Sequence, residues 1–167
     1  MTEQITVREA TSDDRAAIAR LWQELMDFHY HLDPKGFEMR EDALDIWLPW
    51  LDEWLADPER AVLVADAGHD LLGYIFGKPE EEPPVYQRRN HGAIAEACVT
   101  AGSRRRGVGR QLVAALLDWF RERGLTEVHV SAAACNSVSN AFWRAMGFHP
   151  HTVQMRRSLD RAPTKAD

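Results

Sequence analysis

The sequence predicts an α/β protein in which a mixed sheet is sandwiched between helices. Stretches with the repeat of amphipathic helices, about 3.6 residues, alternate with short apolar runs that have the period or length of strands. No internal repeat and no Gly/Ser-rich linker divides the 167 residues, so one domain over residues 1–167 is the simplest organisation.

The first predicted strand is Ile5–Ala10, because its residues alternate in polarity. Thr11, Ser12 and Asp13 offer caps for a helix that ends at Asp33, since the residue before a proline is pushed out of the helical region. The apolar face of this helix recurs at spacings of three and one, and consists of Ile18, Leu21, Trp22, Leu25, Met26 and His29.

A second amphipathic stretch runs from Leu44 to Leu55 and contains Pro49, which predicts a kink or two short helices. Its tryptophans recur at helical spacing, and such a stripe is more often core than an acceptor pocket or a dimer face. The stripe consists of Trp47, Trp50 and Trp54.

Two short apolar runs, Ala61–Ala67 and Leu71–Gly77, flank Gly68-His69-Asp70 and predict a hairpin. The segment Pro79–Asn90 holds three prolines and three glutamates and is predicted to be a loop. Its acidic run, Glu80–Glu82, could attract a cationic amine, although a solvated charge run is the simpler interpretation. Ala93–Thr100 is predicted to be the next strand.

The C-terminal half predicts a helix that starts near Val108 and ends at Gly124, whose missing side chain suits a C-cap. A strand over Glu127–Ala134, a helix over Ser137–Met146 and a last strand over Val153–Leu159 follow.

Composition excludes several classes of function. The net charge of −6 is opposite to that of a basic nucleic-acid binder, and no apolar run is long enough to cross a membrane. The N-terminus lacks the pattern of a signal peptide, and the two cysteines, Cys98 and Cys135, form no metal or disulfide motif. We therefore expect a reducing, cytoplasmic location. The pairs His29/His31 and His149/His151 lack further ligands, so no metal is expected.

Positive charge is concentrated before the central helix. Arg104, Arg105, Arg106 and Arg110 lie within seven residues, next to Gly107 and Gly109. A helix N-terminus presents unpaired N–H groups and a partial positive charge, and glycine lets a ligand approach the backbone, so this stretch predicts a site for a pyrophosphate. Val108 stands where a Walker loop has lysine, and Leu112 replaces the third glycine of a dinucleotide fingerprint.

Two motifs in this region resemble the GNAT superfamily of acyl-CoA-dependent N-acetyltransferases. Arg104-x-x-Gly107-x-Gly109 is similar to the family's (Q/R)xxGx(G/A) motif, and Asn136-x-x-Ser139-x-x-Phe142 followed by Gly147-Phe148 is similar to its next strand–helix motif. The resemblance places the acyl-CoA motif at about 92–123 and the second motif at about 126–148. It implies a mixed sheet of about six to seven strands flanked by about four helices, with splayed central strands.

The resemblance also implies roles in binding acetyl-CoA. The loop would hold the pyrophosphate, the end of the preceding strand would pair with pantetheine, and the second motif would contact the pantetheine or phosphate arm. The Val99 N–H would polarise the thioester carbonyl. The implied binding residues are Cys98, Val99, Thr100, Arg104, Arg105, Arg106, Gly107, Val108, Gly109, Arg110, Asn136, Ser139 and Phe142.

A base must take the proton of the attacking amine. Glu96 lies where many members carry an acidic residue, so it is the first candidate, and its alternative is a solvated or arginine-paired residue. His91 is the second candidate, because the reference pKa of histidine is near neutral. Where the family often has a tyrosine acid, this chain has Trp143, whose indole does not titrate as an acid.

The resemblance therefore implies transfer of an acetyl group from acetyl-CoA to a primary amine of a small molecule, by direct attack in a ternary complex. A protein N-terminal or lysine acetyltransferase is the alternative within the family, and a non-catalytic acyl-CoA sensor is the alternative of another class. Acceptor choice would rest on residues 22–55 and 79–90, whose aromatic content suggests an aromatic pocket. A homodimer is possible.

Overall fold

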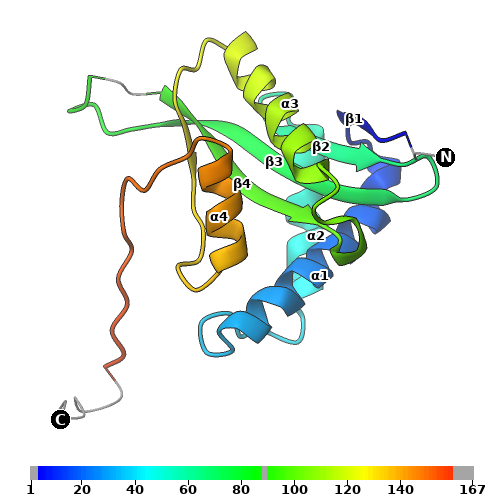
Figure 1. Cartoon of the computed structure of the whole chain (residues 1–167), viewed down its shortest axis with the longest axis horizontal. Coiled ribbons are helices and arrows are strands. Elements are labelled where there is room, and N and C mark those ends of the chain that lie inside the picture. The colour runs from blue at the N-terminus through cyan, green and yellow to red at the C-terminus, as the bar shows by residue number, and fades with distance from the viewer. Residues whose placement is uncertain (1–3, 88–89, 160–167) are drawn as a thin grey trace.

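The computed structural model describes residues 4–87 and 90–159, and Figure 1 shows a sheet with helices on both faces. Two short 3-10 turns, Ser12–Asp14 and Ala101–Ser103, precede α1 and α3. The other elements, in chain order, are β1 (Thr6–Glu9), α1 (Arg15–Leu32), α2 (Ala43–Ala56), β2 (Ala61–Asp66), β3 (Leu71–Glu81), β4 (Asn90–Val99), α3 (Val108–Glu122), β5 (Val128–Val130) and α4 (Ser137–Ala145).

The sheet has the order β1-β2-β3-β4-β5. The first four strands pair antiparallel, while β4 and β5 pair parallel, so the sheet is mixed as predicted. Four helices flank it, also as predicted, but the described residues form five strands rather than six to seven. No helix in the described part of the chain combines the length and the apolar character needed to span a membrane.

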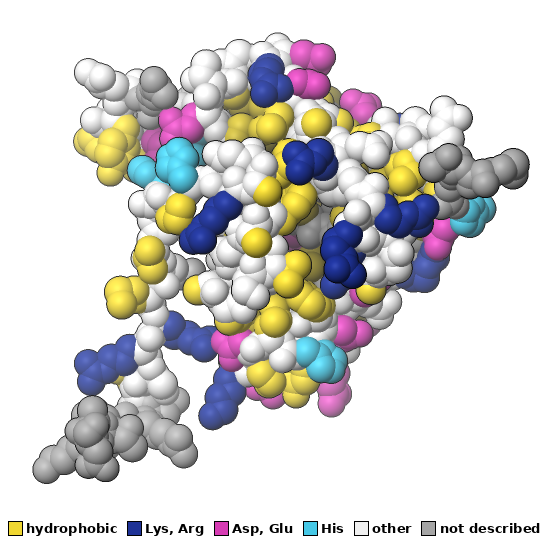
Figure 2. All heavy atoms as spheres, viewed as in Figure 1, with side chains coloured by type: hydrophobic (Ala, Val, Ile, Leu, Met, Phe, Trp, Pro, Cys, Tyr) yellow, Lys and Arg dark blue, Asp and Glu magenta, His cyan; other side chains and the backbone are white. Residues whose placement is uncertain are grey.

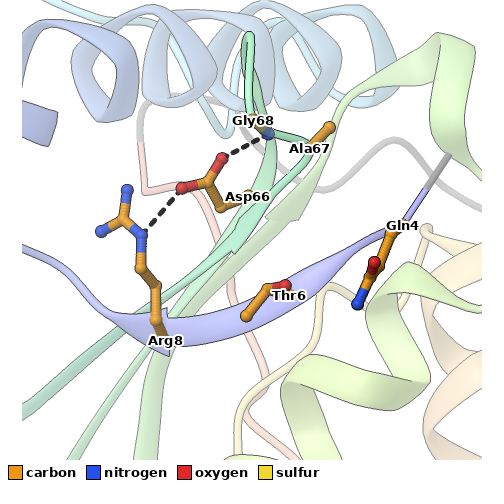
Figure 3. Close-up of a pocket in the computed structure, with 6 residues that line it drawn as sticks. All are labelled: Gln4, Thr6, Arg8, Asp66, Ala67 and Gly68. Atoms are coloured by element: carbon orange, nitrogen blue, oxygen red, sulfur yellow. Dashed lines mark hydrogen bonds and ion pairs between the residues drawn. The ribbon is translucent and has the colours of Figure 1, made fainter.

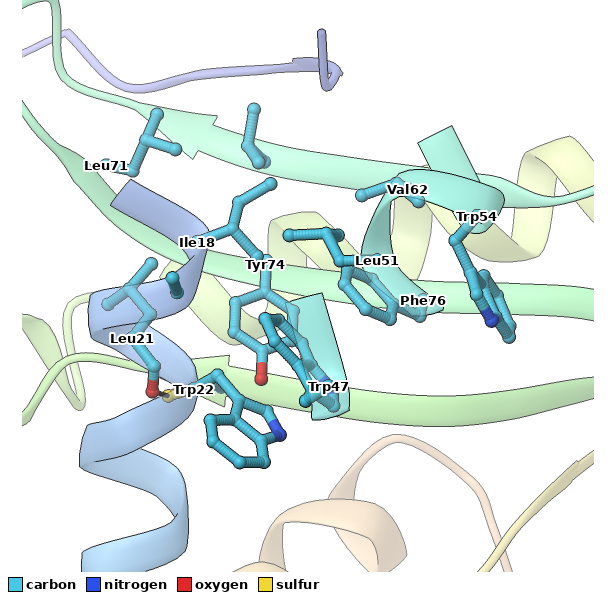
Figure 4. Packing of buried hydrophobic residues seen from close by; sticks show 13 residues of the cluster. Ile18, Leu21, Trp22, Trp47, Leu51, Trp54, Val62, Leu71, Tyr74 and Phe76 are labelled. Carbon is cyan, nitrogen blue, oxygen red and sulfur yellow. Dashed lines mark hydrogen bonds between the residues drawn. The ribbon is translucent and has the colours of Figure 1, made fainter. Parts of the chain in front are cut away.

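Alternating side chains of the strands divide the core into two layers. Val64, Tyr74 and Phe76 pack with α1 and α2, whereas Leu63 and Ile75 pack with α3 and α4. Figure 4 shows the first layer, in which Trp47 and Trp54 are buried beside Phe76. The tryptophan stripe is therefore core, as the sequence favoured.

Pro49 lies within a single helix, α2, rather than between two short ones. Proline removes one backbone donor from a helix. The opposite face of α2 buries Trp47, Leu51 and Trp54 against the sheet, and this packing holds the two halves of the helix in one element.

The predicted loop Pro79–Asn90 is shorter in the structure, because β3 continues to Glu81 and β4 begins at Asn90. Pro79 pairs with Gly92. The Gly92 N–H donates to the Glu127 carbonyl, 2.8 Å away, and so points toward β5 and away from β3. Pro79 and Gly92 therefore form a non-hydrogen-bonded pair of the β3–β4 ladder. Since no hydrogen bond from residue 79 to β4 is needed here, the missing N–H of proline does not weaken the pairing.

β4 loses its β5 neighbour halfway along its length. The pairing runs only from Gly92 with Val128 to Ile94 with Val130, while β4 continues to Val99. At the same point Phe76 pairs with Glu96 and Gly77 with Ile94, so Ala95 is the extra residue of a β-bulge. The expected splay of the central strands thus begins at the bulge.

Two strand predictions near the C-terminus are wrong in extent or in kind. The strand predicted at Glu127–Ala134 covers only Val128–Val130, and Val153–Leu159 is extended but forms no strand. A strand needs a neighbour for its backbone groups. Figure 1 shows the C-terminal segment leading away from the sheet, so a single chain offers it none.

Candidate active site

Glu96 lies among aromatic side chains on the face of the sheet that carries α1 and α2. Its carboxylate accepts a hydrogen bond from the Tyr74 hydroxyl at 2.9 Å and one from Trp47 Nε1 at 3.3 Å. Trp22 stacks on Trp47 with ring centroids 4.7 Å apart. Burial raises the pKa of Glu96 above its usual value, and the two hydrogen bonds lower it by less. The site holds a carboxylate that is more basic than an exposed one.

The end of β4 presents its backbone alternately to β3 and to the side that β5 leaves open. The Thr100 N–H donates to the Leu72 carbonyl of β3 at 2.9 Å, so the Val99 N–H and carbonyl point the other way. By the same alternation the Cys98 N–H faces β3. Of the three residues expected to pair with pantetheine, Val99 is the one whose backbone faces the open side.

The side chain of Cys98 turns into the first core layer. Its Sγ lies 3.4 Å from the Leu21 carbonyl, and burial raises the pKa of the thiol to about 12. A thiol that stays protonated at neutral pH is no nucleophile. The side chain of Cys98 therefore behaves as a small apolar residue of the core.

Glu24 of α1 anchors the turn after β4, a contact that the sequence did not indicate. It accepts hydrogen bonds from Thr100 Oγ1 at 2.8 Å and from the Ala101 N–H at 2.6 Å. The Arg104 guanidinium lies 3.8 Å from the same carboxylate, donates to the Val99 carbonyl at 3.0 Å and covers the Phe28 ring. Arg104 thus folds back onto α1, whereas its sequence position predicted a contact with phosphate.

The turn that leads into α3 keeps the features of an anion site. Gly107 is the N-cap of α3 and has a φ of 85°, in the left-handed region that favours glycine. A Cβ added there would meet nothing within 4 Å, so the space in front of it is open. Val108, Gly109 and Arg110 form the first turn of α3, whose N–H groups have no partner within the helix.

Basic side chains surround this turn. Arg105, Arg106 and Arg110 are exposed, and Figure 2 shows basic side chains on the face in view near the β4–α3 turn. Gly109 brings the turn close to its neighbours, because a Cβ there would lie 3.3 Å from Phe142 Cζ and 3.5 Å from Val99 Cγ2. The residues of the two motifs therefore converge on one site, and its open helix N-terminus fits the pyrophosphate of an acyl-CoA.

On α4, Asn136 has a structural role. Its Oδ1 accepts the Ser139 N–H at 2.9 Å and so caps the helix. Trp143 is buried between Phe142 and Phe148, with ring centroids 5.1 and 5.3 Å away. The residue at the position of the expected tyrosine thus belongs to the core and supplies no acid.

His91, the second candidate base, lies apart from Glu96. It sits near the start of β4, where its ring stacks on His129 of β5 at 3.9 Å. The structure therefore brings Glu96 together with Tyr74 and Trp47, and brings His91 together with a different group of side chains.

Two hollows lie away from Glu96. One has a volume of 390 Å³ and lies between β1 and β2, where Arg8 and Asp66 form an ion pair of 2.8 Å (Figure 3). Arg8 also pairs with Asp14 before α1, so this network ties the first strand to the first helix. The other is a groove of 1320 Å³ that runs along β5, α4 and the segment after α4.

Similar proteins include characterised acetyltransferases. A mycothiol acetyltransferase of Nocardia farcinica is 28% identical over 81% of this chain, and the chain spans 42% of the length of that relative. A solved mutant form of a Bacillus halodurans protein superposes with a TM-score of 0.84 at 22% identity, covering 92% of this chain and 99% of that one. AAC(6')-Iy in complex with the bisubstrate analogue CoA-S-monomethyl-acetylneamine superposes with a TM-score of 0.70 at 20% identity, covering 93% and 98%.

These structural likenesses show the fold. The family follows from the sequence, because the family model of the acetyltransferase (GNAT) family matches residues 18–148, which includes both motifs and Glu96. The chain belongs to the GNAT acetyltransferase family.

Proposed function

We propose that residues 1–167 act as one N-acetyltransferase domain that moves an acetyl group from acetyl-CoA to a primary amine of a small molecule. The observation that supports this most directly is the carboxylate of Glu96, held by Tyr74 and Trp47 beside the point where β4 and β5 separate. Because the chain belongs to the GNAT family, acetyl-CoA is the expected acyl donor. Glu96 is the group proposed to accept the proton of the acceptor amine.

The proposed role of Glu96 is that of the general base. An ammonium group has no lone pair, so its proton must leave before or during attack. The raised pKa of Glu96 makes it a stronger base than an exposed carboxylate, directly or through a water molecule. His91 remains the weaker candidate, because it lies five residues away along β4, in another cluster.

Residues of β4 and of the turn after it would hold acetyl-CoA. When bound, acetyl-CoA supplies a thioester whose carbonyl carbon accepts the amine. The Val99 N–H would donate to the acyl oxygen as negative charge develops on it. The first turn of α3, with Arg105, Arg106 and Arg110, would hold the pyrophosphate, while Arg104 would orient the turn and Phe142 would pack against Gly109.

Departure of the thiolate needs no protein acid in this proposal. Trp143 is buried and cannot donate a proton as an acid. A thiol is far more acidic than an alcohol (the reference pKa of the cysteine thiol is about 8.5), so a thiolate is a reasonable leaving group that takes its proton from water.

A small amine is favoured as acceptor by the aromatic surroundings of Glu96. Trp47 and Tyr74 hydrogen-bond Glu96 and Trp22 stacks on Trp47, so an amine that reaches the carboxylate would meet buried aromatic rings, which suit an apolar or cationic body. The relatives are consistent with this class, since one is a mycothiol acetyltransferase and one structure holds an acetylneamine analogue. We also propose a cytoplasmic location, where acetyl-CoA is available, and a homodimer.

Release of free CoA from acetyl-CoA, measured across panels of small amines and of peptides, tests this proposal. We expect turnover with members of the amine panel, and a fall in kcat of about 100-fold in Glu96→Gln with little change in acetyl-CoA affinity. Glu53→Gln, on the exposed face of α2, is the matched control and should leave kcat unchanged.

Each other outcome selects an alternative. Turnover with peptides alone would assign the chain to protein acetylation. Tight acetyl-CoA binding with no turnover on either panel would make it an acyl-CoA sensor. An unchanged kcat in Glu96→Gln would remove Glu96 as the base.

A further inference from the structure

Two histidines and several carboxylates meet at the end of the sheet near the start of β4. His91 of β4 pairs with Glu80 of β3. His129 of β5 pairs with Ala93, which lies two residues after His91 on β4. The two imidazole rings stack with centroids 3.9 Å apart. Glu82 is the first residue after β3. The ends of three neighbouring strands therefore bring Glu82, His91 and His129 close together.

The ligand atoms are close enough to share a cation. One ligand atom from each of Glu82, His91 and His129 lies within 4.8 Å of the others. His91 Nδ1 is 3.8 Å from Glu82 Oε1, and His91 Nε2 is 3.7 Å from Glu80 Oε2. Ligands about 2.1 Å from a tetrahedral zinc ion are roughly 3.4 Å apart, so a small inward movement would bring these atoms to coordination distance.

An independent observation points to a ligand at this position. His91 is 7% exposed, and its Nδ1 is buried without a hydrogen-bond partner. Among the side chains of residues 4–87 and 90–159, this is shared only with Trp54 Nε1, and of the two only the imidazole nitrogen can offer a lone pair. A buried polar atom without a partner is unfavourable, and coordination of an ion by this nitrogen would remove that penalty.

We propose that Glu82, His91 and His129 bind a divalent transition-metal ion, with zinc the best match to two imidazoles and one carboxylate. His129 is prepared for this role, because its Nε2 contacts Glu127 Oε1 at 2.9 Å. A carboxylate on one ring nitrogen fixes the tautomer that leaves the other nitrogen, Nδ1, as the ligand. The stacked His129 ring would turn to aim Nδ1 at the ion.

The charge and the surroundings of the cluster suit a cation. Glu80, Glu82 and Glu127 contribute three carboxylates around the two imidazoles, and Lys78, 2.8 Å from Glu80, is a nearby positive charge. The cluster opens onto the groove along β5, which leaves room for a water ligand. His151, whose ring lies 5.9 Å from that of His129, extends the site toward the C-terminal segment.

The test is a zinc titration of untagged, metal-stripped protein by calorimetry and by competition with a chromophoric chelator. We expect one zinc ion per chain. Glu82→Gln and His129→Gln should each weaken binding by at least about tenfold. His31→Gln, on the exposed side of α1 and far along the chain from the cluster, is the matched control and should bind zinc like the wild type.

Replacement of zinc by Co²⁺ gives a readout on the unmodified chain that does not depend on how the variants fold. A tetrahedral Co²⁺ site of nitrogen and oxygen ligands absorbs strongly in the visible range, and we expect such a band to saturate at one equivalent. Circular dichroism of each variant checks its fold. No saturable Co²⁺ band, or zinc affinity in well-folded His129→Gln equal to that of the wild type, would overturn the proposal.

Discussion

At the carboxylate of Glu96, burial and hydrogen bonding act in opposite directions. Burial disfavours the charged form and raises the pKa, whereas Tyr74 and Trp47 donate hydrogen bonds that favour the charged form and lower it. Burial has the larger effect, so the pKa lies above the usual value. The two hydrogen-bond donors therefore limit the rise in the pKa of Glu96 that burial causes.

Tyr74→Phe should move the pH dependence of catalysis. The variant removes one donor to Glu96 and raises its pKa further, so the acid limb of the kcat/KM profile should shift to higher pH. One hydrogen bond of about 1 kcal/mol corresponds to a shift of just under one pH unit. Tyr30→Phe, at an exposed position of α1, is the control. Identical acid limbs in Tyr74→Phe and wild type would contradict the proposed role of Glu96.

The same pKa sets the sign of a stability effect. The pKa of Glu96 is higher in the folded state than in the unfolded state. Ionisation of Glu96 therefore does not reduce the stability of the fold at pH values below the unfolded-state pKa, and the loss of stability develops as the pH rises through the folded-state pKa. Because Tyr74 hydrogen-bonds the charged form, Tyr74→Phe should destabilise the fold more at pH 8 than at pH 4. Thermal unfolding at the two pH values measures this difference.

At the scale of elements, the β4–α3 turn is held from two sides. Glu24 of α1 binds the turn at Thr100 and Ala101, and Gly109 lets it pack on Phe142 of α4. Gly107 supplies the left-handed residue that starts α3. The turn is thus organised before any ligand binds, which lowers the entropy cost of holding a pyrophosphate.

Gly107→Ala and Gly102→Ala form a matched pair of variants in this turn. A Cβ at either position meets nothing within 4 Å, but only Gly107 has a positive φ. We expect Gly107→Ala to lower the free energy of unfolding by about 1–2 kcal/mol and to weaken CoA binding, because the turn relaxes. Gly102→Ala should change neither. Chemical denaturation and calorimetry with CoA measure both quantities, and equal behaviour of the two variants would contradict this account.

The elements predicted correctly from the sequence are those that depend on patterns among neighbouring residues. The helical repeat of α1 and α3 and the glycines at positions 107 and 124 depend on neighbours within a few residues, whereas Glu96 was indicated by the family resemblance. The extension of β3 through Pro79 was missed, because a proline is acceptable there only opposite Gly92, which pairs toward β5. The bulge at Ala95 and the anchoring by Glu24 also depend on partners far away in the sequence.

At the scale of the whole molecule, the two faces of the sheet serve different parts of the proposed reaction. The face that carries α1 and α2 holds Glu96 and its aromatic neighbours, and the proposed pyrophosphate site lies at the start of α3, which packs on the other face. In the described part of the sheet, β4 lacks a neighbour on one side where its pairing with β5 has ended. That place lies beyond Ile94, where β5 ends and β4 continues to Val99.

The Glu82, His91 and His129 cluster shows why whole-molecule contacts lie beyond sequence spacing. These residues are separated by 9 and 38 positions, which matches no metal motif, and they meet because β3, β4 and β5 are adjacent in the sheet. The sequence directed attention instead to His149 and His151, of which His151 alone approaches the cluster. Strand order decides which ligands meet, and it is not encoded locally.

The segment after α4 leads to a prediction about assembly. Its alternating apolar residues Val153 and Met155, together with Leu159, are 80%, 90% and 87% exposed. Its contacts with the body include the ion pair of Arg156 with Asp33 at 3.0 Å and the ring of His151, 5.9 Å from that of His129. β5, at the edge of the sheet, has three residues and pairs only with β4 among the described strands. Within residues 4–87 and 90–159, these apolar side chains are therefore exposed, and no described strand pairs with the outer edge of β5.

A second copy of the chain would satisfy both, and we predict a homodimer in which each C-terminal segment covers the partner. Each buried Val, Leu or Met contributes about 1.5–3 kcal/mol, so a few such residues per chain can stabilise the pair. Light scattering after gel filtration should give twice the chain mass for the wild type and for Val85→Asp, an exposed apolar control outside the segment. Met155→Asp should give a monomer, because it would bury a charge in the interface. A wild-type monomer at every concentration tested would exclude this assembly and leave the exposed apolar segment as a property of the single chain.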